Sequence, residues 1–280
     1  ALSSAASDVY KRQLKILDPG QRENCDYILR IVGDIVSRYD VDGLHIDDYF
    51  YPYPVAGVAI PDQASYNRYG RQFASVADWR RDNVDVFIKA LGEEIHRIKP
   101  WVKFGVSPFG IYRNKKSTAD GSGSNTNGLQ NYDDLYADIT YWVQQGWIDY
   151  NIPQIYWEIG HPAADYITLI KWWDKNANGG HLYIGQDVAR TMKADQLTRK
   201  MRYERALPHV SGNCFWPANE ILWNNKGVAD SLRRNYHRYP ALIPAYTHMH
   251  NRPPKDVSKL KTEWTPKGFL LHWQAEQSPT

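Results

Sequence analysis

The sequence predicts an α/β fold of the (β/α)8 TIM-barrel type, in incomplete form, with strands four to eight of the eight present and the start of a β module behind them. Two observations predict the barrel. Five short apolar segments are each followed by a segment of helical periodicity, as in a parallel sheet covered by helices. Polar and aromatic residues also recur where these apolar segments end, which is where barrel enzymes carry their sites.

The first helix is expected over 19–39, because Asp18 and Pro19 form a helix start and apolar residues follow at spacings of three and four. A strand at 43–48 and a loop to about residue 70 come next. The alternation then continues with a helix that ends before Pro100, a strand at 102–107, a helix at 132–146, a strand at 148–157, a helix at 163–176, a strand at 181–186, a helix at 193–206, a strand at 213–216 and a helix at 219–237.

A doubly wound open sheet would show the same alternation. Its glycine fingerprint follows none of the strands, however, which favours the barrel. A closed barrel needs eight strands and this chain opens with a helix, so strands one to three are expected to be missing.

The domain organisation follows from this alternation. Residues 1–13 lack periodicity and are set aside as a leader or sequence artefact, and residues 14–245 form the partial barrel. Residues 246–280 are a linker and the beginning of a β-sandwich module. Two short strands within 253–260 and 268–273 resemble the opening of a fibronectin type III module.

Composition excludes several function classes. The 280 residues are 23% charged with a net charge of +3, which predicts no nucleic-acid partner. We expect no membrane-spanning segment and no signal peptide in this chain. The two cysteines and nine histidines match no metal-ligand spacing, so no metal and no cofactor are expected. The oxygen-rich stretch at 120–128 lacks the terminal Glu of a calcium loop and is interpreted as a flexible loop.

Acidic residues follow three of the predicted strands. In Asp42–Pro52, Leu44 and Ile46 alternate with His45 and Asp47, so period 2 places His45 and Asp47 on one face. Asp48, Glu158 and Asp187 also lie at strand ends. Cleavage of a glycosidic bond needs two carboxyl groups, and these four are the catalytic candidates. For Asp48 and Asp187, a role as the cap of a turn or helix is an equally good interpretation.

Aromatic residues make up 14% of the chain, with 11 Trp and 20 Tyr. Such rings either fill a core or stack on sugar rings, and their position at strand ends favours the sugar. The candidate substrate-binding residues are His45, Tyr49, Tyr51, Gln154, Tyr156, Trp157, Gln186 and Trp216.

Four motifs, Tyr39–Pro52, Asp78–Asn83, Gly105–Ile111 and Gly146–Trp157, together resemble the bacterial glycosyl-hydrolase-like family related to glycoside hydrolase family ten. The resemblance spans about residues 17–240. It implies a (β/α)8 barrel, export from the cytoplasm to the periplasm, cell envelope or exterior, and cleavage of glycan strands such as peptidoglycan freed of its stem peptides.

Residue by residue, the resemblance places the strand-four acid on Asp47 and the strand-six motif on Pro153, Gln154, Tyr156 and Trp157. The strand-seven motif falls on Tyr183–Gln186. Glu158 as the acid/base rests on analogy with other glycosidase barrels.

Three functions fit these observations. The first is a glycoside hydrolase for a bacterial polysaccharide, with Asp47 as nucleophile or charge stabiliser, Glu158 as acid/base and Asp187 as its alternative. The second is a non-catalytic barrel that binds glycan through the same residues. The third is a fragment with no activity of its own, because open barrel edges would aggregate. The predicted partner is a glycan, and no feature of the sequence specifies an oligomeric state.

Overall fold

The computed structural model describes residues 16–246 and 256–274, and the chain divides into two units, Ala1–Pro244 and Ala245–Thr280. The segment 1–13, set aside above, lies outside the described residues. The first unit is built on a parallel sheet of five strands. These are β1 (Gly43–Ile46), β2 (Lys103–Val106), β3 (Tyr150–Asn151), β4 (His181–Asp187) and β5 (Val210–Trp216).

The strand order of this sheet is β1-β2-β3-β4-β5, so each strand pairs with the next one along the chain. A doubly wound sheet needs a reversal of strand order, and this sheet has none. Parallel strands in consecutive order, joined by crossovers of one hand, carry their helices on one face. The five-stranded parallel sheet is therefore consistent with a TIM-like barrel, as the sequence predicted.

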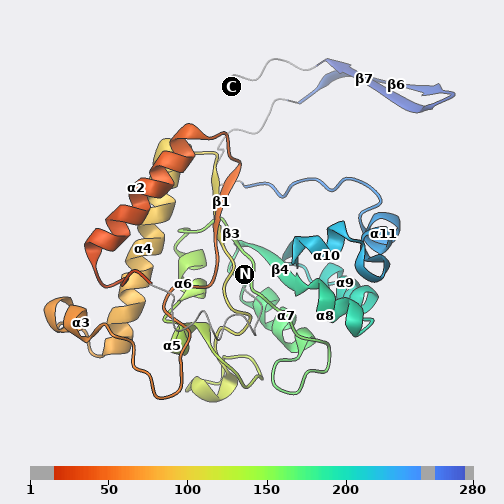
Figure 1. Cartoon of the computed structure of the whole chain (residues 1–280). Helices are drawn as coiled ribbons and strands as arrows, with labels where there is room; N and C mark the ends of the chain where they lie inside the picture. The colour runs from red at the N-terminus through yellow and green to blue at the C-terminus, as the bar shows by residue number, and fades with distance from the viewer. Residues whose placement is uncertain (1–15, 247–255, 275–280) are drawn as a thin grey trace. The chain divides into compact units, whose positions relative to one another are not determined.

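The helices alternate with the strands along the chain, and most of them pack on the strand that comes after them (Figure 1). The α4 helix packs on β2, α6 on β3, α7 and α8 on β4, and α9 and α10 on β5, while α2 lies against α4. Their bounds are α2 (Arg22–Arg38), α3 (Gln63–Tyr69), α4 (Val76–Ile98), α5 (Asn131–Asp134), α6 (Ile139–Gln144), α7 (Tyr166–Lys175), α8 (Val188–Lys193), α9 (Leu197–Arg205), α10 (Ala218–Leu222) and α11 (Val228–Ser231).

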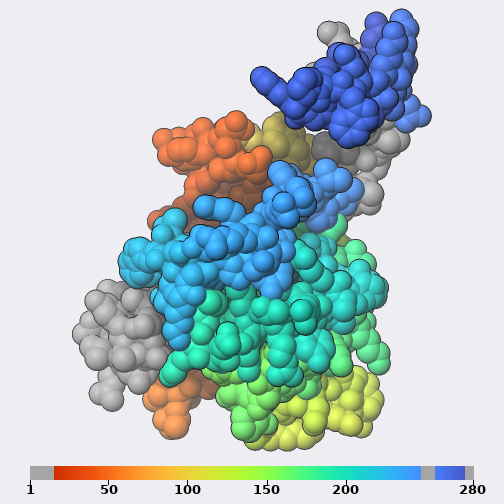
Figure 2. All heavy atoms as spheres, turned by 90° about the vertical axis from the view of Figure 1, so that its right-hand side faces the viewer, coloured from red at the N-terminus to blue at the C-terminus, as the bar shows by residue number. Residues whose placement is uncertain are grey.

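The core lies between the sheet and these helices. Val84, Ile88, Leu91 and Ile95 repeat along α4 at helical spacing and pack with Phe104 of β2, all almost fully buried. A second, smaller cluster joins α8 and α9 to the helical segment from Val228 to Tyr236. It consists of Val188, Leu197, Met201, Val228 and Leu232. Figure 2 shows this side of the unit, with the light-blue residues of α10 and α11 over the green-to-cyan residues of α8 and α9.

Several predicted elements differ in the structure. The helix predicted at 132–146 is divided into α5 and α6, because Tyr136 adopts a φ of 56° that no α-helix continues. The helix predicted at 219–237 is broken in the same way at Asn224 and Lys226, with φ values of 51° and 50°. The short helices α3 and α8 were not predicted. None of the described helices combines the length and apolarity needed to cross a membrane.

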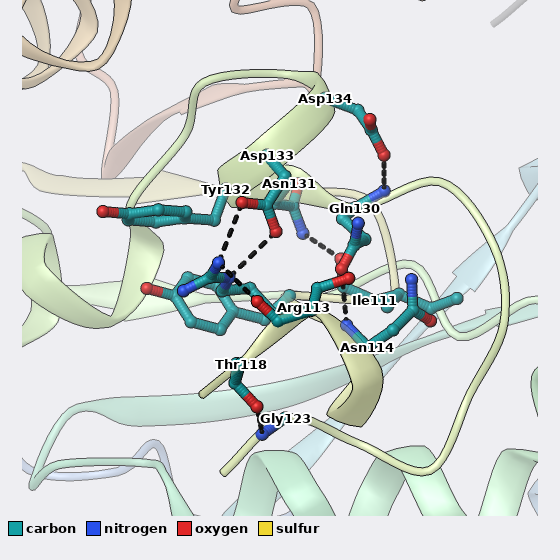
Figure 3. A network of polar contacts seen from close by, with 12 residues as sticks. Ile111, Arg113, Asn114, Thr118, Gly123, Gln130, Asn131, Tyr132, Asp133 and Asp134 are labelled. Atoms are coloured by element: carbon teal, nitrogen blue, oxygen red, sulfur yellow. Dashed lines mark hydrogen bonds and ion pairs between the residues drawn. The ribbon is translucent and has the colours of Figure 1, made fainter. Parts of the chain in front are cut away.

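The loop after β2 is tied to α5 by polar contacts (Figure 3). The Asn114 amide donates to Gln130 Oε1 at 2.7 Å, and Arg113 makes two 2.9 Å bonds to Asp133. Within the stretch that the sequence suggested as a flexible loop, Asp120 Oδ1 accepts from the Ser122 amide at 3.0 Å. Its carboxylate thus closes a local turn.

The described part of the second unit forms an antiparallel hairpin of β6 (Ser258–Thr265) and β7 (Gly268–Gln274). The second predicted strand agrees with β7. The first is displaced, since β6 continues to Thr265, and residues 253–255 of the predicted strand lie outside the described residues. Leu260, Trp264, Phe269 and Trp273 of the hairpin are exposed.

Candidate active site

Asp47 follows β1 at the carboxyl edge of the sheet, and its side chain is exposed. Gln154 Nε2 donates to Asp47 Oδ1 at 2.5 Å, and the backbone amide of Asp48 donates to the same oxygen at 2.9 Å. The structure thus brings Asp47 and Gln154 together, although 107 positions separate them. The contact arises because the chain after β3 adds Gln154 to the sheet between Phe109 and Gly185.

Asp48 has the opposite environment, because it is only 4% exposed and its Oδ2 accepts a hydrogen bond from the Tyr53 hydroxyl. Burial raises the pKa of Asp48 to about 6; the Tyr53 hydrogen bond acts against that shift, while the neighbouring Asp47 charge adds to it. Two adjacent carboxyl groups therefore differ in solvent access, and the raised pKa of the buried Asp48 is of the kind found at acid/base sites. Tyr53 was one of several strand-end tyrosines in the sequence, and nothing there singled it out.

Tyr156 and Trp216 stack on each other, with ring centroids 5.5 Å apart and planes 15° from parallel. Tyr156 lies in the segment after β3 and Trp216 ends β5, so the fold brings two residues together that are 60 positions apart in the sequence. Burial raises the pKa of Tyr156, and the nearby Asp47 charge adds to the shift. This pair lies beside the Asp47 carboxylate and offers a flat surface for a sugar ring. His45, also near Asp47, stacks on Tyr150 at 5.8 Å.

A chain of aromatic rings crosses the ends of β1, β2 and β3. Tyr49, which is 57% exposed, lies 5.9 Å from Tyr53. Tyr53 contacts Phe109 at 6.2 Å, and Phe109 contacts Trp157 at 5.4 Å, both nearly edge-on. We name these four residues the aromatic arc. The predicted residues Tyr49 and Trp157 thus belong to one surface, joined by Tyr53 and Phe109.

Glu158 is half-buried in the loop after β3, and its charge acts on the buried ammonium group of Lys200. Lys200 Nζ donates to the carbonyl oxygen of Trp157 at 2.8 Å. Burial lowers the pKa of the Lys200 ammonium to about 8, and the nearby carboxylates, Glu158 first, act against this shift. Lys200 looked like an ordinary helix-surface residue in the sequence, because its burial depends on partners from other elements.

Asp187 serves as the N-cap of α8, since its Oδ1 accepts from the Arg190 amide at 2.8 Å. Burial raises the pKa of Asp187, and the hydrogen bond from Arg190 opposes that shift. These contacts are those of a helix cap, which is one of the two roles that the sequence left open for Asp187.

Two of the predicted substrate-binding residues do not reach this surface. Tyr51 is 1% exposed, accepts a 3.2 Å bond from Asn83 Nδ2 and packs edge-on against Tyr136. Gln186 is 0% exposed, and its Nε2 donates to Glu204 Oε1 at 2.7 Å on the helix side of the sheet. Both are core residues, so direct contact with a substrate does not agree with their burial.

Among the described residues, no three His, Cys, Asp or Glu side chains are grouped where they could hold a metal ion.

A parallel α/β sheet with carboxyl groups and aromatic rings at its strand ends is an arrangement that barrel enzymes use for their sites, and paired carboxyl groups are the residues that glycoside hydrolysis needs. The comparisons with known proteins agree. The family described as glycosyl hydrolase-like 10 matches residues 4–201, and this chain belongs to that family.

Two curated relatives of this chain are named glycosyl hydrolases. The chain is 41% identical over 265 residues to the glycosyl hydrolase YngK of Bacillus subtilis, covering 90% of this chain and 52% of that protein. It is 42% identical over 216 residues to the glycosyl hydrolase DigH of Escherichia coli K12, covering 72% of this chain and 48% of that protein. The chain thus spans about half the length of these relatives.

Proposed function

We propose that this chain carries the catalytic carboxylates of a glycoside hydrolase that cleaves O-glycosidic bonds of a bacterial polysaccharide, with peptidoglycan glycan strands as the first candidate. The observation that carries the proposal is the exposed Asp47 carboxylate, held by two N–H donors beside the stacked rings of Tyr156 and Trp216. A fixed carboxylate next to a sugar platform can stabilise the positive charge that develops on the sugar during cleavage.

Glu158 is the proposed acid/base. Asp187 is the alternative, but its Oδ1 already caps α8, whereas no hydrogen bond of this kind ties down the Glu158 carboxyl group among the contacts of the described residues. Asp48 supports Asp47 from the buried side through its own amide. The aromatic arc extends the glycan-binding surface beyond the Tyr156 and Trp216 pair.

Three further features belong to this proposal. The parallel sheet is part of an eight-stranded barrel, and the β6–β7 hairpin opens a fibronectin type III-like sandwich, because the exposed rings of a two-stranded hairpin need a covering sheet. The protein acts outside the cytoplasm, because peptidoglycan lies there.

The test is to incubate the full-length protein with defined glycan strands and identify the reducing ends released. Asp47→Asn and Glu158→Gln are each expected to lower turnover by at least about 100-fold while the fold persists. Asp42→Asn, an exposed Asp at the other end of β1, and Glu93→Gln on α4 are the matched controls. Full activity in both site variants would overturn the assignment, and glycan binding without cleavage by the wild type would favour a non-catalytic glycan-binding barrel.

A further inference from the structure

We propose that Gln154 is a positioning residue, which fixes Oδ1 of Asp47 by a hydrogen bond so that Oδ2 faces the reacting carbon of the glycan. The inference rests on the proposed function of Asp47. It gives Gln154 a different role from the substrate contact expected from the sequence.

The first argument is the number of donors on the Gln154 amide. A side-chain amide nitrogen carries two N–H groups. Gln154 Nε2 lies 2.5 Å from Asp47 Oδ1 and 2.9 Å from the carbonyl oxygen of Ser107. Both donors are therefore used by the protein. The reverse orientation would place the amide oxygen against two acceptors, so the contacts also fix which way the amide points.

The second argument is the rigidity of the backbone that carries Gln154. Its amide donates to the Pro108 carbonyl at 2.9 Å, and the residue bridges Phe109 on one side and Gly185 on the other. At Gly185, an added Cβ would meet the Pro153 oxygen at 2.9 Å, so only glycine allows this close approach. A side chain on such a backbone can hold another group within the small tolerance that catalysis requires.

The third argument concerns the two oxygens of Asp47. Oδ1 accepts both the Gln154 bond and the 2.9 Å bond from the Asp48 amide, and neither donor reaches Oδ2. Each N–H donor reduces the charge that its acceptor oxygen can offer to another partner. Positive charge develops at the anomeric carbon in the transition state, so the oxygen without these donors interacts with it more strongly. Oδ2 is therefore the oxygen presented to the substrate.

Two variants of the full-length protein separate this role from substrate binding, with peptidoglycan glycan strands freed of stem peptides as the probe. Gln154→Leu removes both donors. We expect kcat to fall about 100-fold, because a catalytic carboxylate displaced by about 1 Å loses roughly that factor in rate, while KM stays within threefold of the wild-type value. Gln154→Glu keeps the shape. Its protonated form donates again to Asp47, so its activity is expected to recover toward lower pH, while Gln154→Leu stays low at every pH.

Gln130→Glu is the matched control, since Gln130 accepts from the Asn114 amide away from Asp47, and it is expected to keep wild-type kinetics. Wild-type kcat and pH profile in both Gln154 variants would overturn the inference, as would a rise in KM alone. If the wild type cleaves no glycan, the proposed function fails separately. The Gln154 side-chain amide signal in a ¹⁵N spectrum then decides, because it must move in Asp47→Asn; an unchanged signal overturns the positioning role.

Discussion

The ammonium nitrogen of Lys200 lies 2.8 Å from the carbonyl oxygen of Trp157, so a buried cation on α9 holds the residue that precedes Glu158. Lys200 also donates to Thr191 Oγ1 at 2.9 Å, and its Nζ lies 4.3 Å from the ring of Tyr166. The side chain is 0% exposed. One buried charge thus joins α7, α8 and α9 to the turn that carries the proposed acid/base.

Lys200→Met is expected to lower the free energy of unfolding at pH 7 by about 2 kcal/mol, because the Trp157 carbonyl and the Thr191 hydroxyl lose a charged donor in the interior. Urea denaturation measures the change. Lys89→Met is the matched control, because Lys89 is half-exposed on α4 and pairs only loosely with Glu93 at 3.8 Å. Lys89→Met should lower the free energy of unfolding by less than about 0.5 kcal/mol. Equal losses in the two variants would show that the Lys200 contacts add no stability.

The pair of His96 on α4 and Asp149 before β3 predicts a pH-dependent stability. The two side chains meet at 3.0 Å, and the Asp149 hydrogen bond raises the pKa of His96. The folded state then binds the proton more tightly than the unfolded state. The contribution of this pair to the free energy of unfolding is complete when the pH lies below the pKa of His in the unfolded state, about 6.5. It is lost as the pH rises through the higher pKa of His96 in the folded state.

The difference in unfolding free energy between wild type and His96→Gln should therefore be about 1 kcal/mol larger at acidic pH than at pH 8, measured by urea denaturation. His209→Gln is the control, since His209 meets Asp174 at 3.4 Å with its side chain more exposed. A difference that is constant with pH would contradict the proposed ion pair.

The sequence predicted the fold well where local periodicity decides. Leu44 and Ile46 alternate with His45 and Asp47, and the structure places Asp47 at the edge of the sheet with His45 nearby. The same rule applied to β4 would have placed Gln186 with Leu182 and Ile184, on the face that packs against helices. Gln186 is therefore a core residue, because its place in the period-2 pattern of β4 decides its environment and the motif around it does not.

The burial of other residues depends on tertiary contacts, which the periodicity of the sequence does not predict. Lys200 and Glu204 are four residues apart on α9, and an opposite-charge pair at this spacing is typical of an exposed helix face. Both are buried because Tyr166 of α7, Gln186 of β4 and Asn213 of β5 converge on Glu204. Burial raises the pKa of Glu204 to about 7 against the effect of these hydrogen bonds.

Tyr53→Phe is expected to raise the pKa of Asp48 above its value of about 6, because the variant removes the hydroxyl that donates to the ionised carboxylate. The ring and its contact with Phe109 are retained, so the change isolates the hydrogen bond. A ¹³C titration of the Asp48 carboxyl group measures it. Tyr49→Phe, at an exposed neighbouring hydroxyl, should leave the titration unchanged. A pKa that falls or stays constant in Tyr53→Phe would contradict the contact.

Trp216→Ala is expected to weaken glycan binding about 10-fold, with KM rising more than kcat falls, because the Tyr156 and Trp216 stack provides a flat apolar surface worth about 1.4 kcal/mol. Trp216→Phe keeps a ring and should recover part of the loss. Trp101→Ala is the matched control, since Trp101 is 52% exposed just before β2, at the opposite end of the strands. Steady-state kinetics on defined glycan strands, with circular dichroism to verify folding, measure the effect. Equal rises in KM for Trp101→Ala and Trp216→Ala would place the glycan elsewhere, whereas a rise confined to Trp216→Ala would assign the stacked pair to sugar binding.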